Sequence, residues 1–171
     1  MTTPRTRSLV VSLTVSTMLA SLVMLAPAHA QPRSHAAPAA RVGVQDAHDA
    51  HGSTALRDKM LALVNRSRHL RGLPALRIDD RVSREALSHS RSMSRASAIA
   101  HTPNLAAIIV RAGGTVFGED VGKGRGLRGI RDAWLRRSDT RGILLDRRFQ
   151  HAGLGVIHRD GYYWVTLQAF N

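Results

Sequence analysis

The chain has 171 residues, of which 25 are lysine or arginine and 12 are aspartate or glutamate, giving a net charge of +13 at pH 7. This length predicts a single domain, and the excess of cations favours acidic partners or surfaces without specifying a fold. The chain contains no cysteine, which excludes disulfides, thiolate metal ligands and a cysteine nucleophile.

The beginning of the chain has the pattern of a secretory signal peptide. Arg5 and Arg7 form a positive start, an apolar run follows over residues 9–25, and the tripeptide AHA ending at Ala30 has the spacing of a cleavage site. We therefore expect residues 1–30 to be a signal peptide and the protein to be secreted to the extracellular side.

The remainder divides into a linker and a folded domain. Residues 31–52 are alanine-rich and polar without a sustained period, which predicts a flexible linker. Residues 53–171 are expected to fold, and apolar residues at helical spacing predict four helices in their first part. The predicted helices begin near Ser53, near Asp79 or Asp80, at Pro103 and near Leu127, and Gly72 and Gly113 are expected to end the first and third.

The end of the chain has the pattern of a β-hairpin. Apolar residues predominate in the segments 153–157 and 162–170, and Asp160-Gly161 between them is a preferred two-residue turn. Helices followed by a terminal hairpin predict an α+β domain, because a parallel α/β sheet would alternate strands and helices.

Two functions fail on their sequence requirements. The glycine-rich run from Gly118 to Gly126 has the wrong spacing for a phosphate loop, and Gly124 follows Lys123 where Ser or Thr is needed, so a mobile connection is expected there. Nucleic acid is not expected as a partner, because the aromatic cluster at residues 162–164 is distant in sequence from the arginine-rich stretch 134–149.

Several short motifs follow one another along the chain in a characteristic order. Residues 63–93 contain N-x-x-R, G-L-x-x-L and A-x-x-H-S-x-x-M, and they are followed by an H-T pair at His101 and by GED at 118–120. GLGV at 153–156 and the closing YYWVTLQAF complete the series. This ordered set resembles the CAP superfamily, also called the SCP domain, in its bacterial form. The resemblance implies a three-layer α-β-α sandwich with a small antiparallel sheet and a C-terminal hairpin.

The resemblance also implies a site, since in the fullest family members two histidines and two glutamates line a cleft and can hold a divalent metal. His101 matches the first histidine and Glu119 the first glutamate. Counting along the family pattern W-x-x-S-P-x-H-R from Trp134 places Thr140 where the second histidine is expected, and Arg137 at the usual serine. His101, Glu119, Thr140 and Arg137 are therefore the candidate ligand-binding residues, and His101 is the candidate metal ligand.

The departures from the family pattern predict a degenerate metal site. One imidazole and one carboxylate make a poor zinc site, because catalytic zinc usually takes three protein ligands. If Arg137 points into the cleft, it would repel a cation and could pair with Glu119. His151 or His158 could supply a second nitrogen, and Asp120 stands where the family has asparagine. We expect no catalytic residues and no resident cofactor, with zinc as the remaining candidate.

The resemblance implies a secreted, non-enzymatic protein that binds a small apolar ligand such as a lipid or a sterol, or that acts as an extracellular interaction module. The alternative is an arginine-rich module that contacts anionic wall polymers or lipids of the cell envelope. An extracellular hydrolase is a lesser alternative. It is disfavoured by the missing histidine, since histidine is the most usual general base.

Overall fold

The computed structural model describes residues 42–171, so the predicted signal peptide and the first part of the predicted linker lie outside the described residues. Helix α1 (Val42–His69) begins upstream of Ser53, and residues 42–52 therefore continue the first helix where a linker was predicted. The other helices are α2 (Asp80–Ala96), α3 (Leu105–Arg111), α4 (Leu127–Arg136) and α5 (Ser138–Leu144). The strands are β1 (Arg77–Ile78), β2 (Phe117–Gly124), β3 (His151–Arg159) and β4 (Tyr162–Phe170).

The four strands form one sheet in the order β1-β3-β4-β2. The predicted hairpin is confirmed, since β3 and β4 pair antiparallel and Arg159 lies opposite Tyr162. The turn residues Asp160 and Gly161 both have positive φ, 51° and 75°, as a two-residue turn of this kind requires. The short β1 runs parallel to β3, so the sheet is mixed and not purely antiparallel.

The glycine-rich run forms most of strand β2, and the expectation of a mobile connection there was wrong. Residues Phe117 to Gly124 pair along their whole length with β4. The glycines allow helices to approach closely, because an added Cβ at Gly122 would lie 2.6 Å from Ile130 of α4. Backbone pairing with β4, which is distant in sequence, therefore holds this segment as a strand, although its glycine-rich composition does not predict one.

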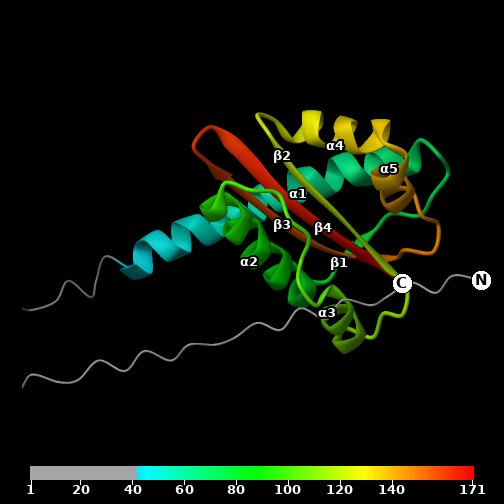
Figure 1. Ribbon diagram of the computed structural model, residues 1–171, viewed down its shortest axis with the longest axis horizontal. Coiled ribbons are helices and arrows are strands. Elements are labelled where there is room, and N and C mark those ends of the chain that lie inside the picture. Colours follow the sequence, from blue (N-terminus) through cyan, green and yellow to red (C-terminus); the bar gives the residue numbers. More distant parts are fainter. Residues whose placement is uncertain (1–41) are drawn as a thin grey trace, which may run out of the picture. The chain divides into compact units, whose positions relative to one another are not determined.

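Helices cover both faces of the sheet, which confirms the α-β-α sandwich (Figure 1). Helices α2 and α3 pack on one face, and α1, α4 and α5 pack on the other. Among the described residues, no helix combines the length and the apolar character needed to cross a membrane. The larger core lies under α1, α4 and α5 and contains Met60, Val64, Leu76, Ile130, Trp134, Leu144, Phe149, Ala152, Leu154, Val156, Val165, Leu167 and Ala169.

Helix α2 lies directly against β3. Asp79 caps its N-terminus, as one of the two predicted candidates, by accepting a hydrogen bond of 2.8 Å from the backbone N–H of Val82. An added Cβ at Gly155 would lie only 2.2 Å from the carbonyl carbon of Ala86. The Ser90 hydroxyl donates to the carbonyl of Gly155 over 3.1 Å. The G-x-G pattern of β3 therefore allows the backbone of α2 to pack directly against the backbone of the strand.

Candidate functional site

Glu119 is the centre of a buried hydrogen-bond cluster on the α2 face of the sheet. Its Oε1 accepts from Nδ1 of His101 and from the backbone N–H of Thr102, each at 2.8 Å. Its Oε2 accepts from the Thr102 hydroxyl and from Nε2 of Gln168, the latter at 3.0 Å. Gln168 lies directly opposite Glu119 in the strand register, so the sheet itself aligns the two side chains.

Burial alone would raise the pKa of Glu119, but the hydrogen bonds from Thr102, Gln168 and His101 outweigh burial and lower that pKa below its usual value. The carboxylate is therefore charged at neutral pH and fixes the His101 ring through Nδ1. The His101 side chain is 73% exposed, which leaves its Nε2 facing outward from the cluster. The structure thus brings together two predicted residues, His101 and Glu119.

The other two predicted residues have different partners. Thr140 lies on α5, and its hydroxyl donates over 2.7 Å to the carbonyl of Trp134 at the end of α4. Arg137 pairs with Asp139 at 2.9 Å, and this hydrogen-bonded ion pair lowers the pKa of Asp139 to about 2. The suggested pairing of Arg137 with Glu119 was wrong, because Arg137 is an exposed side chain bound to its own neighbour.

The residues present do not fit a zinc site. Both oxygens of Glu119 already accept hydrogen bonds, so Nε2 of His101 is the remaining atom of this cluster that could coordinate a metal ion. The two further histidines considered from the sequence pack against aromatic rings, His151 on Phe170 and His158 on Tyr163, with centroids 5.4 and 4.5 Å apart. No group of three or more histidine, aspartate or glutamate side chains converges anywhere in the part of the chain that the structure describes.

Asp120 is a buried carboxyl. The sequence indicated only that it stands where the family pattern has asparagine, and did not predict its burial. It is 0% exposed, and neither of its side-chain oxygens has a hydrogen-bond partner. Successive residues of a strand point to opposite faces, so Asp120 faces α4 and α5, away from Glu119. Burial, with the negative charges of Asp139 and Glu119 adding to it, raises the pKa of Asp120 to about 8.

A groove of about 1210 Å³ lies between α1 and α4. Its apolar lining comes from Ala62, Leu63, Ala75 and Leu127. Its polar lining is cationic or neutral at every position and comes from Lys59, Asn65, Arg66, His69, Arg128 and Arg131, with Gly126 completing the wall. Sequence reasoning missed this groove, although the cations recur three or seven residues apart along each helix, a spacing that places them on one side.

The cationic side chains of the groove differ in whether they form hydrogen bonds and ion pairs with other residues. Arg131 donates to the Ser67 hydroxyl over 3.0 Å and lies 2.7 Å from the carboxylate of Asp132. Lys59, Arg66 and Arg128 are exposed, and none of them forms an ion pair with a described acidic residue. The groove therefore joins an apolar floor to a rim of cations with free hydrogen-bonding capacity.

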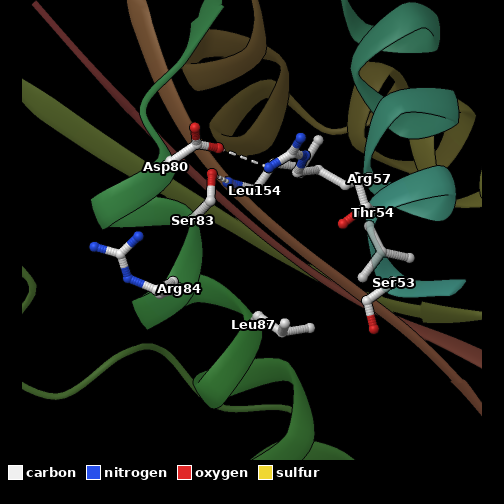
Figure 2. A pocket seen from close by; sticks show the side chains of 9 residues that line it. Ser53, Thr54, Arg57, Asp80, Ser83, Arg84, Leu87 and Leu154 are labelled. Atoms are coloured by element: carbon white, nitrogen blue, oxygen red, sulfur yellow. Dashed lines mark hydrogen bonds and ion pairs between the residues drawn. The ribbon is translucent and has the colours of Figure 1, made fainter. Parts of the chain in front are cut away.

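A second, smaller pocket of about 290 Å³ lies between α1 and α2 (Figure 2). Arg57 of α1 reaches across to Asp80 of α2, with 2.9 Å between the guanidinium nitrogen and the carboxylate oxygen. Ser83 accepts a hydrogen bond of 3.1 Å from the backbone N–H of Leu154. These side chains therefore fasten two helices and a strand together, which makes the pocket a weaker ligand-site candidate than the groove.

Comparison with solved structures shows the same fold in bacterial proteins. An extracellular SCP-domain protein of Bacillus anthracis matches with 24% identity and a TM-score of 0.56, covering 70% of this chain and 41% of that one. An outer surface protein of Borrelia burgdorferi matches with 17% identity and a TM-score of 0.60, covering 67% and 90%. A cysteine-rich secretory protein of Staphylococcus aureus matches with 17% identity and a TM-score of 0.56, covering 70% and 39%.

This chain therefore spans about two fifths of the length of the Bacillus and Staphylococcus proteins. A comparison with curated proteins gives no match. The model of the cysteine-rich secretory protein family, CAP, matches residues 61–169, which is most of the described chain. Together with the sandwich fold and the ordered motifs, this match shows that the chain, although it has no cysteine, belongs to the CAP family.

Proposed function

We propose that this chain is a secreted, non-enzymatic CAP domain that binds an anionic, lipid-like molecule in the groove between α1 and α4. The observation that carries the proposal is the combination of an apolar floor with a cationic rim in this groove of about 1210 Å³. Secretion is expected from the signal-peptide pattern of residues 1–30, and the structural relatives include extracellular and outer surface proteins.

The chemistry of the groove selects for a molecule with two unlike parts. Leu63 and Leu127 offer apolar surface that an acyl chain would remove from water, at about 25 cal/mol per Å². Lys59, Arg66 and Arg128 offer positive charge for a carboxylate or phosphate head. An uncharged apolar ligand would leave these cations without a counter-charge, so an anionic amphiphile fits better than a neutral one.

An enzymatic role has weaker support. His101 is oriented by a carboxylate, as a general base would be, but it lies on the protein surface and lines neither of the two described pockets. We therefore propose no catalytic residue and no resident zinc.

The proposal can be tested by native mass spectrometry of protein purified from an exporting host, followed by titration with a fluorescent fatty acid. A co-purified lipid-sized mass and saturable binding are expected. Leu127→Gln should weaken the binding by roughly tenfold, by removing apolar contact and leaving a polar group in its place. The control is Arg136→Gln, on the same helix but outside the groove. Bare protein without saturable fatty-acid binding would refute the proposal.

A further inference from the structure

A second cationic cluster lies at the far end of β2, outside the groove. The ammonium of Lys123 lies 4.5 Å from the ring centroid of Tyr162 and 4.5 Å from that of Trp164. The guanidinium of Arg125 lies 5.5 Å from the Tyr162 ring. Lys123 and Trp164 are direct partners in the β2–β4 register, so the sheet fixes which ring the lysine covers.

These cation–π contacts hold the cluster in place without neutralising it. Each such contact restricts a long side chain while its charge stays in water. Lys123 and Arg125 are both exposed, and neither pairs with an acidic residue among those described. The neighbouring Asp160 lies 3.4 Å from Arg159, its own partner at the hairpin turn.

The cluster lacks what a lipid surface or a fatty acid would need. Trp164 is buried and Tyr162 is half-buried beneath the cations, so no exposed aromatic or aliphatic side chain of the cluster is available to enter a bilayer. A pre-positioned pair of cations on a hydrophilic strand end instead suits a soluble anionic chain, which binds through charge and loses little by staying hydrated.

We infer that Lys123 and Arg125, held on Tyr162 and Trp164, form a docking site for an extracellular polyanion whose repeating units carry phosphate or carboxylate groups. This site is separate from the groove and does not depend on the proposed function. Lys123 and Arg125 precede Gly126, Leu127 and Arg128 in the chain but do not line the groove themselves, so a polymer could bind the cluster while the groove stays open.

The test measures binding of the full chain to poly(glycerol phosphate) and to polyglutamate at two salt concentrations. The double variant Lys123→Met with Arg125→Gln should bind roughly tenfold or more weakly, since it removes both charges that would contact the polymer. The matched control, Arg136→Gln with Arg147→Gln, removes the same charge from exposed arginines elsewhere and should stay within about twofold of the parent. Tyr162→Leu keeps the charge but removes a ring under both cations, so an intermediate loss is expected.

The preferred polymer identifies whether phosphate or carboxylate is the natural group. Leu127→Gln, which changes the groove without changing the charge, should bind either polymer as the parent does, which separates this inference from the proposed function. Equal losses in the cluster variant and its arginine control would overturn the inference, because net charge alone would then explain binding. Binding to vesicles of anionic phospholipid, with none to either polymer, would overturn it as well.

Discussion

Asp120 places an ionisable carboxyl in the apolar layer between β2 and the helices α4 and α5. Its cross-strand neighbour is Leu167, and Gly118 and Gly122 flank it on the same face of the strand. An added Cβ at Gly118 would lie 3.0 Å from Ile143 of α5, which shows how closely that helix covers the strand. A charge there would have neither water nor a partner, which is the physical cause of the raised pKa of Asp120, about 8.

This raised pKa predicts that the protein loses stability as the pH rises. Between about pH 4 and pH 8 the folded form keeps the Asp120 proton, whereas the unfolded chain releases it, so rising pH favours unfolding in this window. The loss from this group approaches about 1.4 kcal/mol per pH unit. Asp120→Asn, which cannot ionise, should lack this slope. Urea unfolding of both proteins at pH 5, 6, 7 and 8 measures it, and parallel pH curves would contradict the raised pKa.

His101 predicts the outcome of a metal titration. Glu119 holds Nδ1 of the ring, and among the described residues no group of three or more histidine, aspartate or glutamate side chains converges there. Zinc is therefore expected to bind weakly, with a dissociation constant far above that of a site with three protein ligands. Calorimetric titration of the purified protein measures this constant. Tight binding of one zinc per chain that is lost in His101→Ala would contradict this expectation and would show that other side chains coordinate the metal together with His101.

At the scale of elements, the contact between α2 and β3 depends on a missing side chain. Gly155→Ala places a Cβ against the backbone of Ala86 and Leu87, which cannot move without shifting the helix. The expected loss in unfolding free energy is about 3 kcal/mol or more. The control is Gly129→Ala in α4, where an added Cβ meets nothing within 4 Å and should stabilise the helix by about 0.5 to 1 kcal/mol. Thermal unfolding of both variants checks the two signs, and a tolerated Gly155→Ala would contradict the close approach.

Elements with a local signal could be predicted from the sequence. The cap at Asp79 and the turn at Asp160-Gly161 depend on chemistry within a few residues, and both are as predicted. The strand β2 and the helix α5 have no such signal. Three glycines weaken β2 as a local strand, and α5 (Ser138–Leu144) is barely two turns long with Gly142 inside it. Both form because the surrounding layers hold them.

The same distinction holds for the sites. The motif resemblance placed His101 and Glu119 correctly as candidates to lie together, because each stands in a short pattern of its own. The groove combines residues of α1 with residues of α4 that are some sixty positions later, and only the packing of two helices brings Lys59 and Arg128 into the lining of one groove. Lys123 and Trp164 likewise meet through the strand register, which one sequence does not specify.

At the scale of the whole molecule, Arg68 joins the first helix to the loop that precedes β3. The side chain is 0% exposed and donates to four backbone carbonyls, those of Pro74, Leu144, Asp146 and Phe149, at 2.9 to 3.0 Å. Burial lowers the pKa of Arg68, and the nearby charge of Asp146 partly offsets this. One guanidinium therefore donates hydrogen bonds to carbonyl groups both in the loop after α1 and in the segment between α5 and β3.

All contacts of Arg68 lie on the α1 and α5 side of the sheet, but because a small domain unfolds as one unit we predict that Arg68 stabilises the whole sandwich. Arg68→Met fills similar space but removes the side-chain donor from four backbone carbonyls, of which those of Leu144 and Phe149 are buried, so a loss of about 3 kcal/mol or more is expected. The two tryptophans of the chain report on opposite faces, Trp134 on the α4 side and Trp164 on the α2 side. In single-tryptophan variants, with phenylalanine at the other position, the two urea transitions should coincide in the parent and shift together in Arg68→Met. A shift confined to the Trp134 signal would mean that the two layers unfold separately and that Arg68 stabilises only its own.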